Sequence, residues 1–392
     1  MEYFNVPSLA GTREFKLKRL LFVVTEDWYF VSHRLYMAIS AVSLGYKVAL
    51  LSKVSIHKEL IEGHGIEVIN WSLKRKSMNI VTEIKAYKEV ASAIDYFQPD
   101  IVHSVALKPM LYNAIQLHRK YTYSNVYALG GLGFIFSSKK PKASIIRFLL
   151  VSILRVALKR RNARIILQNS DDLNLLLKLK IIESDKTCLI KGVGVDTKVF
   201  KPFKNEPKTP TVMLPARMLW DKGIIDFIQV AKNIKIHLPE TRFVLVGSPD
   251  EHNPESVPVV KLNEWASEGI IEWWGHNDEM HSIYKLATII CFPSYREGLP
   301  KSLLEAASCG VPIVSYDVPG SREIVIDQLN GLLVPLKNID ALSNAIKTLL
   351  NDRLLRVNYG KSGRELVINE FSQEKIAVET NILWQEVLNC RL

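Results

Sequence analysis

The chain has 392 residues, of which 48% are apolar and 23% charged, and its formal net charge is +11. At about 150 residues per domain the length predicts two domains, and the composition excludes disordered, collagen-like and disulfide-stapled chains. Residues 1–200 hold 30 Lys and Arg against 16 Asp and Glu, a balance of +14, whereas residues 201–392 hold 21 against 24, a balance of −3. This asymmetry predicts that an anionic partner meets the first half only.

The four cysteines show no C-x-x-C spacing, so they indicate neither a disulfide framework nor a structural zinc site, and they favour a cytoplasmic location. Residues 1–18 have charges and a proline but no apolar stretch, so we expect a short N-terminal extension and no signal peptide.

Short β-branched runs at residues 20–25, 48–51, 66–69, 101–104, 126–129 and 164–168 alternate with helical stretches, of which the first covers residues 32–44. Buried runs of this length between helices are typical of parallel strands in a doubly wound sheet, so residues 19–200 form one predicted domain.

The apolar pattern stops at residues 201–210, which contain three prolines and are the predicted linker. A second alternation follows, with strands expected at residues 212–216, 243–247, 270–275, 289–293, 313–316 and 332–335. We therefore predict a second domain at residues 211–370 and a C-terminal helix within residues 371–392. Two Rossmann-like domains would face each other across a cleft, and ligands in such sheets bind at the carboxyl ends of strands.

Residues 144–158 form an apolar stretch with two arginines and a basic flank on each side, including Lys139, Lys140 and Lys159. Fifteen residues are too few for a membrane span, which needs about twenty. Two interpretations stay open: a core helix of the first domain, or a helix lying in the membrane interface against anionic lipid.

Two familiar nucleotide motifs are absent, because neither the dinucleotide fingerprint G-x-G-x-x-G nor the Walker pattern occurs after a predicted strand. The glycine-rich segment 130–133 is either a plain turn or backbone that lines the cleft. Dinucleotide redox chemistry and P-loop chemistry are therefore excluded.

Two segments of the second half place charged residues directly after strands. Arg217 and Lys222 follow the first strand of the second domain, where an arginine fork, an ammonium group and free helix N–H groups can hold a diphosphate. Glu297 and Glu305 follow the fourth strand, where carboxylates can accept hydrogen bonds from sugar hydroxyls. Surface charge without a ligand is the alternative for both segments.

The R-x4-K pattern of Arg217 and Lys222 and the E-x7-E pattern of Glu297 and Glu305 resemble the donor-site signatures of glycosyltransferase family 4, whose fold is GT-B. The likeness extends from residue 18 to the end and is strongest to bacterial enzymes that extend sugars on polyprenyl-diphosphate lipids. It implies that Arg217 and Lys222 bind the donor diphosphate and stabilise the leaving nucleotide.

By the same resemblance Glu297 binds the transferred sugar and Glu305 the ribose. The remaining residues of the implied donor site are Gly298, Leu299, Pro300, Gly247, Gly275, His276 and Asn277. On the first domain we expect His103 at the carboxyl end of the strand at residues 101–104. The resemblance implies that it reaches the sugar or the reacting centre, although a lone histidine is commonly structural. The candidates for acceptor binding are Ser32, His33, Arg34 and Lys108.

The resemblance further implies a retaining, metal-independent transfer of a hexose or N-acetylhexosamine, with a UDP-sugar as donor, no cofactor, and no nucleic acid as partner. The acceptor would be a lipid-linked sugar at the inner face of the cytoplasmic membrane. The resemblance implies front-face displacement in which the leaving phosphate assists the acceptor, since no residue is placed as a covalent nucleophile. Gly130 stands where some relatives have an acidic residue or histidine, which argues against a catalytic base at that position. The alternatives are a GT-B enzyme with a soluble acceptor, such as a sugar phosphate or an epimerase substrate, and an inactive binding protein of this fold.

Overall fold

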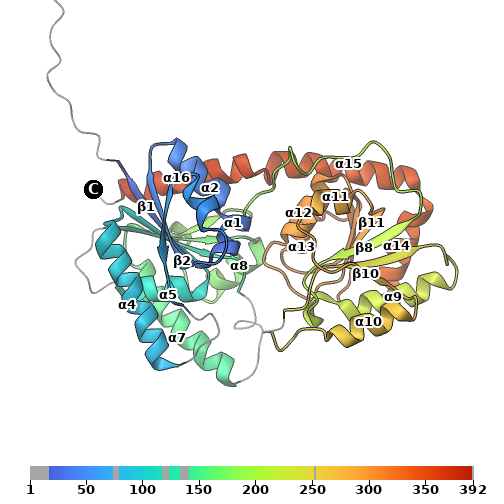
Figure 1. Ribbon diagram of the computed structural model, residues 1–392, viewed down its shortest axis with the longest axis horizontal. Coiled ribbons are helices and arrows are strands. Elements are labelled where there is room, and N and C mark those ends of the chain that lie inside the picture. The colour runs from blue at the N-terminus through green and yellow to red at the C-terminus, as the bar shows by residue number, and fades with distance from the viewer. Residues whose placement is uncertain (1–16, 74–78, 117–122, 133–140, 251–252, 391–392) are drawn as a thin grey trace, which may run out of the picture.

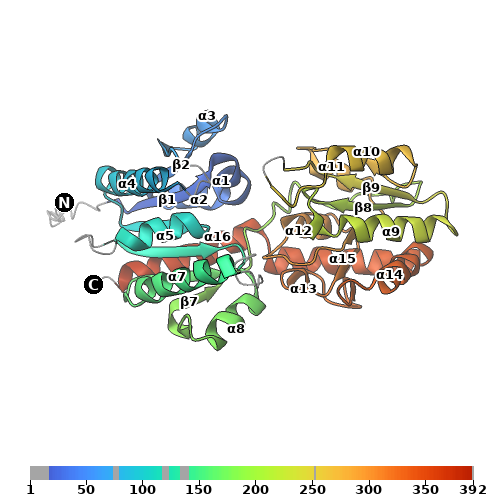
Figure 2. The same cartoon turned by 90° about the horizontal axis from the view of Figure 1, so that it is seen from below.

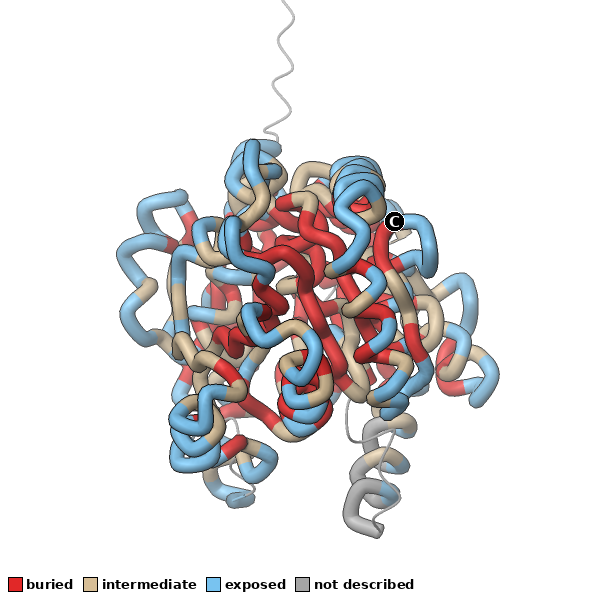
Figure 3. The backbone as a smooth tube through the Cα atoms, turned by 90° about the vertical axis from the view of Figure 1, so that its right-hand side faces the viewer, coloured by how far each residue is buried: buried red, intermediate tan, exposed pale blue. Residues whose placement is uncertain are grey.

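The computed structural model describes residues 17–73, 79–116, 123–132, 141–250 and 253–390, so residues 1–16 of the predicted extension lie outside it. Two lobes lie side by side, each built on a parallel sheet (Figure 1). The strands of both sheets are mostly buried. Seen along the long axis, buried residues gather at the centre of the molecule and exposed residues at its periphery (Figure 3). The prediction of two doubly wound α/β domains is confirmed.

The first sheet has seven strands in the order β3-β2-β1-β4-β5-β6-β7, all parallel. Their bounds are β1 Arg19–Glu26, β2 Lys47–Lys53, β3 Ile66–Asn70, β4 Ile101–Val105, β5 Ser124–Leu129, β6 Ala163–Leu167 and β7 Thr187–Leu189. The helices of this lobe are α1 Asp27–His33, α2 Leu35–Ser43, α3 Lys58–Glu62, α4 Ile80–Phe97, α5 Leu107–Ile115, α7 Pro141–Leu158, α8 Ser170–Lys178 and the 3-10 turn η2 Ser184–Lys186.

The second sheet has six parallel strands in the order β10-β9-β8-β11-β12-β13. Their bounds are β8 Thr211–Pro215, β9 Arg242–Val246, β10 Glu272–Trp273, β11 Ile289–Phe292, β12 Ile313–Tyr316 and β13 Gly331–Val334. Around them lie η3 Trp220–Lys222, α9 Ile224–Lys235, α10 Val259–Ser267, α11 Met280–Tyr284, α12 Lys301–Ser308, α13 Ser321–Ile324, α14 Ile339–Asn351 and α15 Arg353–Glu370.

The last helix, α16 Gln373–Asn389, returns to the first domain, as predicted (Figures 1 and 2). Its buried residues Ile376, Leu383, Trp384 and Val387 join the same apolar cluster as β1 and α2. Burial of an aromatic and three aliphatic side chains stabilises this contact, at about 25 cal/mol for each Å² of apolar surface removed from water. The helix therefore links the two lobes through the short turn after α15.

Two predicted elements differ from the structure. The helix expected at residues 32–44 is two helices, because Arg34 has φ −135° and ψ −14° and interrupts the helical backbone between α1 and α2. The strand expected at residues 270–275 is only β10, because Gly275 has φ +68° and turns the chain away from the sheet. The short edge strand β7 is an element that the sequence pattern did not indicate.

Candidate functional site

A cavity of about 250 Å³ lies between the two domains. One wall comes from α1 and the segments after β5, β6 and β7, and the other comes from the loops after β8 and β11 and from α12. The lining residues are Tyr29, His33, Gly130, Gln168, Gly192, Val193, Arg217, Glu297, Gly298, Leu299 and Leu304. The predicted cleft between the domains is confirmed, with α12 on the side that faces the first lobe (Figure 2).

An ion pair between Lys222 and Glu297 lies at this cleft. Lys222 ends the η3 turn, and its Nζ lies 2.6 Å from Oε1 of Glu297 in the loop after β11. Ser294 Oγ donates a hydrogen bond of 2.7 Å to the same oxygen. Only 13% of the Lys222 side chain and 12% of the Glu297 side chain is exposed, so the pair acts in a medium of lower dielectric constant than water. A cation and a carboxylate are thus fixed next to each other at the cleft.

Arg217 supplies the second predicted cation. It follows β8, lines the cavity and has 53% of its side chain exposed. Its contact with Asp250 is 3.4 Å long and solvent-exposed, which makes it a weak ion pair. The guanidinium can therefore exchange this contact for a bidentate one to an anion in the cavity.

The loop that contains Glu297 is held in place by hydrogen bonds to Asp226 of α9. Asp226 is buried, and the sequence analysis did not identify it. Asp226 accepts hydrogen bonds from Tyr295 at 3.2 Å and from Tyr316 at 2.7 Å. Burial, together with the Asp226 carboxylate, raises the pKa of Tyr295 to about 12, so the phenol stays a donor. An isolated Asp in an amphipathic helix gives no sequence signal for this role.

The same loop touches the first domain. Gly298 O accepts a hydrogen bond of 2.9 Å from Asn169 Nδ2, and a Cβ on Gly298 would lie 1.5 Å from the carbonyl oxygen of Gly130. Leu299 lies against Gly192 in the segment after β7. Only a glycine at position 298 permits this approach, which brings the predicted glycine-rich segment to the cleft.

Ion pairs beside the cavity hold the two domains together. Arg296 Nη2 lies 3.2 Å from Asp172 Oδ1, and Arg322 Nη1 lies 2.9 Å from Asp171 Oδ1. Lys191 pairs with Glu323 at 2.9 Å. These contacts join α8 and the segment after β7 in the first domain to α13 and the loop after β11 in the second domain.

Two protein-family models match most of this chain. The model of the family "Glycosyl transferase 4-like" matches residues 19–170, and that of the family "Glycosyl transferases group 1" matches residues 195–366. The chain is a GT-B glycosyltransferase. The first family model matches within residues 1–200, whose charge balance is +14, and the second matches the part of the chain that contains Arg217, Lys222, Glu297 and Glu305.

Among curated relatives, the glycosyltransferase is 29% identical over 337 residues to N,N'-diacetylbacillosaminyl-diphospho-undecaprenol alpha-1,3-N-acetylgalactosaminyltransferase of Campylobacter jejuni, covering 83% of this chain and 85% of the relative. It is 22% identical to the UDP-Gal:alpha-D-GlcNAc-diphosphoundecaprenol alpha-1,3-galactosyltransferase of Escherichia coli, covering 76% and 78%.

Two solved structures share the fold. Sucrose-phosphate synthase from Thermosynechococcus elongatus gives a TM-score of 0.79 at 20% identity, covering 95% of this chain and 99% of that one. HepE from Anabaena in complex with UDP-glucose gives 0.73 at 17% identity, covering 93% and 99%.

Of the predicted donor residues of the glycosyltransferase, Gly298 and Leu299 line the cavity, whereas Glu305 and Pro300 do not. Glu305 is 7% exposed on α12, pairs with Lys301 at 3.0 Å and accepts a hydrogen bond from Tyr284 at 3.2 Å. Pro300 is the N-cap residue directly before α12, where a proline's missing N–H removes no helical hydrogen bond.

The glycines and polar residues predicted beside the nucleotide lie on two adjoining loops of the glycosyltransferase. Gly247 N donates to the carbonyl of Gly275 at 2.7 Å, and a Cβ on Gly247 would lie 1.9 Å from the carbonyl oxygen of Ala216. His276 is exposed and contacts Asp278, while Asn277 accepts a hydrogen bond from the Glu279 amide. The structure thus brings Gly247 next to the segment that carries Arg217.

Of the predicted acceptor residues, only His33 lines the cavity, with its ring stacked on Tyr29 at 4.1 Å. Ser32 is exposed on α1 and does not line it. Lys108 lies on α5 and its Nζ is 2.8 Å from Glu83 of α4, away from the cavity lining. Arg34 is buried directly beside His33.

The predicted position of His103 at the end of a strand is wrong. We expected it at the carboxyl end of a strand, but it lies in the middle of β4, is 1% exposed and stacks on Phe22. Its Nδ1 accepts a hydrogen bond of 3.1 Å from Trp384 Nε1 of α16. Side chains alternate along a strand, and residue 103 lies on the face of the sheet that α16 covers, against Trp384. The ring is therefore part of the contact with α16 and does not line the cleft cavity.

Helix α7 contains the apolar stretch for which two interpretations were open. Leu154, Ala157 and Leu158 are buried in the first domain, whereas Phe148 is 70% exposed and Val156 56% exposed. The last turns of α7 are therefore part of the core of the first domain. The exposed side chains of Phe148 and Val156 leave the second interpretation open. Lys139 and Lys140 of the basic flank lie outside the described residues. None of the described helices has the length and apolar character needed to span a membrane.

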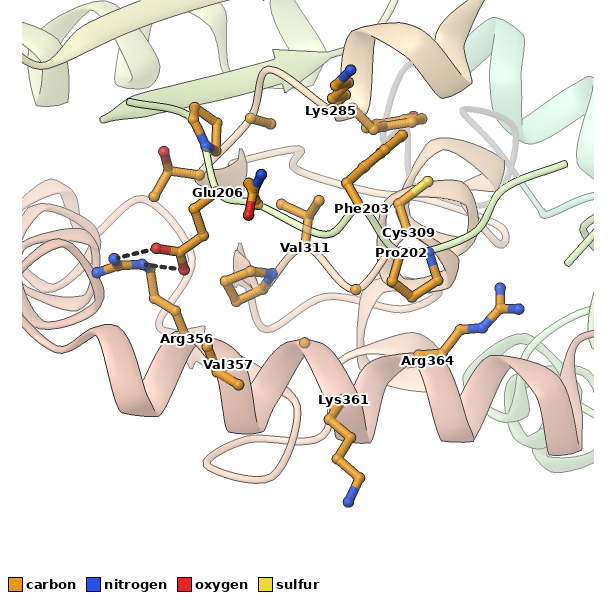
Figure 4. A pocket seen from close by; sticks show the side chains of 18 of the residues that line it. Pro202, Phe203, Glu206, Lys285, Cys309, Val311, Arg356, Val357, Lys361 and Arg364 are labelled. Atoms are coloured by element: carbon orange, nitrogen blue, oxygen red, sulfur yellow. Dashed lines mark hydrogen bonds and ion pairs between the residues drawn. The ribbon is translucent and has the colours of Figure 1, made fainter. Parts of the chain in front are cut away.

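A separate cavity of about 450 Å³ lies between the segment 202–207 and α15 (Figure 4). Glu206 pairs there with Arg356 at 3.0 Å, and Arg364 donates hydrogen bonds to the carbonyls of Phe200 and Thr197. None of the predicted site residues lines this cavity, so it is distinct from the cleft.

The buried carboxylate of Asp27, the first residue of α1, ties this helix to the segment after β2. This side chain accepts hydrogen bonds from the Ser55 amide at 2.5 Å, the Ser55 hydroxyl at 2.6 Å and the Trp28 amide at 2.7 Å. Burial raises the pKa of Asp27, but the hydrogen bonds from Ser55, His57 and Trp28 outweigh it and hold the pKa below its ordinary value.

Asp27→Asn is therefore expected to lower the melting temperature at pH 7 and to flatten its dependence on pH. A depressed carboxyl pKa stabilises the fold above the unfolded pKa of about 3.9, and this contribution disappears as the pH falls through the folded value. Thermal unfolding of both proteins from pH 7 to pH 3 tests this. Ser55→Ala should give a smaller loss of the same sign, and a constant difference between Asp27→Asn and wild type at all pH values would contradict the assignment.

Proposed function

We propose that the protein is a retaining glycosyltransferase that moves a hexose or N-acetylhexosamine from a UDP-sugar to a polyprenyl-diphosphate-linked sugar. The observation that carries this proposal is the Lys222–Glu297 pair at the cleft of a chain that is 29% identical to a transferase named for a diphospho-undecaprenol acceptor. An N-acetylhexosamine is the preferred sugar.

The proposed chemistry uses the charges at the cleft. Lys222 and Arg217 bind the donor diphosphate and stabilise the negative charge that develops on the leaving nucleotide. Glu297 accepts hydrogen bonds from hydroxyls of the sugar. The bond between C1 and the phosphate oxygen breaks, the acceptor oxygen attacks the same face, and its proton passes to the departing phosphate. The two cations supply the charge stabilisation, so the proposal includes no metal or other cofactor.

Access to a lipid-linked acceptor favours a peripheral position on the inner face of the cytoplasmic membrane. The +14 balance of residues 1–200 and the exposed Phe148 on α7 support this position. We expect co-sedimentation with anionic vesicles at low salt, released at high salt, and weaker binding of Phe148→Ser. Leu354→Ser removes a side chain that is also 70% exposed, from α15, and should bind like wild type. Equal binding to neutral vesicles would contradict this position.

A screen of nucleotide sugars tests the activity. UDP-N-acetylglucosamine, UDP-N-acetylgalactosamine, UDP-galactose and UDP-glucose are each incubated with the protein, with and without a polyprenyl-diphosphate sugar, while UDP release is measured. We expect release that depends on the lipid acceptor, with an α-linked product. Release with a sugar phosphate instead supports the soluble-acceptor alternative, and binding of UDP without turnover for any acceptor supports the inactive binding protein.

A further inference from the structure

The cavity of about 450 Å³ beside α15 lies at the opposite edge of the second sheet from the cleft (Figure 4). Its lining includes residues of the segments 284–288 and 309–312, which lead directly into β11 and β12. Parallel strands begin at one edge of a sheet, and the cleft lies at the other edge, where they end. The volume falls within the range of about 300 to 1,000 Å³ that small-molecule sites occupy. This cavity is therefore large enough for a ligand of its own.

The charge of the lining differs from that of its surroundings. Residues 201–392 contain 21 Lys and Arg against 24 Asp and Glu. The lining contains six cations against a single carboxylate, that of Glu206; the cations are Lys204, Lys285, Arg353, Arg356, Lys361 and Arg364. Charge of one sign around a concave site attracts a ligand of the opposite sign. The lining therefore favours an anion.

The carboxylate of Glu206 does not cancel this positive charge. Its Oε2 lies 3.0 Å from Nη2 of Arg356, whose side chain is only 10% exposed, so the carboxylate is already paired with one cation. The described partners of Arg364 are carbonyl and hydroxyl oxygens, which leave its charge in place. The two arginines thus add a fixed positive potential to the cavity.

Three further cations of the lining can meet an incoming anion. Lys204 and Lys285 are exposed. Arg353 is 75% exposed, and its contact of 3.3 Å with Glu206 is a weak ion pair because water screens it. Lys361 points away from the cavity (Figure 4). The charged rim is therefore formed by Lys204, Lys285 and Arg353.

The wall between these charges is apolar. The apolar side chains that line it are those of Pro202, Phe203, Ala287, Val311, Pro312 and Val357. Burial raises the pKa of the Cys309 thiol, which also lines the cavity, to about 12, so this group stays protonated and is a poor nucleophile. The wall is suited to bind an apolar body and not to react with it.

We propose that this cavity is a second ligand site, for a small organic anion. The apolar body of the ligand lies against Phe203 and Val311, and its phosphate or carboxylate group meets Lys204, Lys285 and Arg353. The site goes beyond the proposed function and does not depend on it.

Equilibrium dialysis with four probes tests the ligand class. The probes are 1-naphthyl phosphate, 1-naphthoate, 1-naphthol and inorganic phosphate. We expect one site per chain for a naphthyl anion, with about tenfold weaker binding or less for 1-naphthol and inorganic phosphate, because each lacks one half of the ligand. The preference between the two naphthyl anions identifies the charged group. Binding of 1-naphthol as tightly as the anions, or no binding of either anion, overturns the proposal.

Substitutions test the location. Val357→Trp fills part of the cavity, and the double variant Lys204→Glu with Lys285→Glu reverses the charge of its rim. Each should weaken binding of the naphthyl anion by about tenfold or more. These side chains are exposed, so the melting temperature should stay near that of wild type. A lining variant that binds like wild type overturns the proposal.

Matched controls come from residues outside the lining. Leu354→Trp adds the same ring to a 70% exposed position of α15, and Lys232→Glu reverses a charge on α9. Both should bind the naphthyl anion like wild type. A loss in either control as large as in the lining variants would also contradict the location.

Competition with UDP separates this site from the cleft. Excess UDP should leave binding of the naphthyl anion unchanged, and displacement by UDP would overturn the proposal. None of these measurements uses sugar transfer, so failure of this inference is distinguishable from failure of the proposed function. A protein that binds the naphthyl anion here but releases no UDP in the donor screen would keep this site and lose the transferase assignment.

Discussion

Lys222→Ala is expected to lower kcat for sugar transfer by about 10²- to 10³-fold, because it removes a cation that stabilises the leaving diphosphate. The effect should fall on kcat more than on the KM for the acceptor, since the charge develops only in the transition state. The measurement is steady-state release of UDP with the donor and acceptor found in the screen.

This substitution also leaves the Glu297 carboxylate without its 2.6 Å partner in a setting that is only 12% exposed. Loss of one member of a buried pair costs about 3 kcal/mol, so thermal unfolding has to accompany the kinetics. Lys222→Met with Glu297→Gln removes both charges and should recover stability without recovering activity. Lys232→Ala on the exposed face of α9 is the matched control and should retain both. Wild-type turnover in Lys222→Ala would refute the role of the pair.

Gly298→Ala is expected to reduce transfer by about 10²-fold or more while leaving each domain folded. The new Cβ would lie 1.5 Å from the carbonyl oxygen of Gly130 on the other domain, so the lobes have to separate. A displacement of about 1 Å between reacting groups is enough for a loss of this size. UDP affinity should fall less than the rate of transfer, because the predicted donor residues other than Gly298 keep their positions within the second domain. Kinetics, calorimetry with UDP and small-angle scattering measure the three consequences.

Gly363→Ala is the control for this substitution. Gly363 lies in α15, and a Cβ there would meet Ala307 Cβ at 3.6 Å, an ordinary contact. Alanine in a helix interior is favoured over glycine by about 0.5 to 1 kcal/mol, so this variant should be active and slightly more stable. A fully active Gly298→Ala enzyme with an unchanged radius of gyration would show that the contact with Gly130 is not needed.

The sequence predicted those parts of the site that depend only on which residues directly follow a strand. Arg217 and Glu297 lie where expected because each follows a buried β-branched strand, and parallel strands bring their carboxyl ends to one edge of a sheet. The same reasoning placed His103 wrongly, because the apolar run did not reveal where β4 ends or that residue 103 faces Trp384.

Other features depend on contacts between distant segments. Asp226 supports the Glu297 loop through Tyr295 and Tyr316, which are 69 and 90 residues away in the chain. No periodicity in α9 distinguishes this carboxylate from a surface one. The burial of Arg34, which forms no ion pair with a described residue, is likewise a property of its surroundings, since the sequence shows only an arginine after a histidine.

By itself the sequence determined two parallel α/β domains, the returning C-terminal helix and the residue types of the donor loop, because strand and helix periodicity and turn chemistry act over a few neighbouring residues. Only the tertiary structure decided that Lys222 pairs with Glu297 across 75 residues and that Asn169 holds Gly298 across 129. Such contacts between distant residues are set by the packing of whole domains, which no short stretch of sequence reveals.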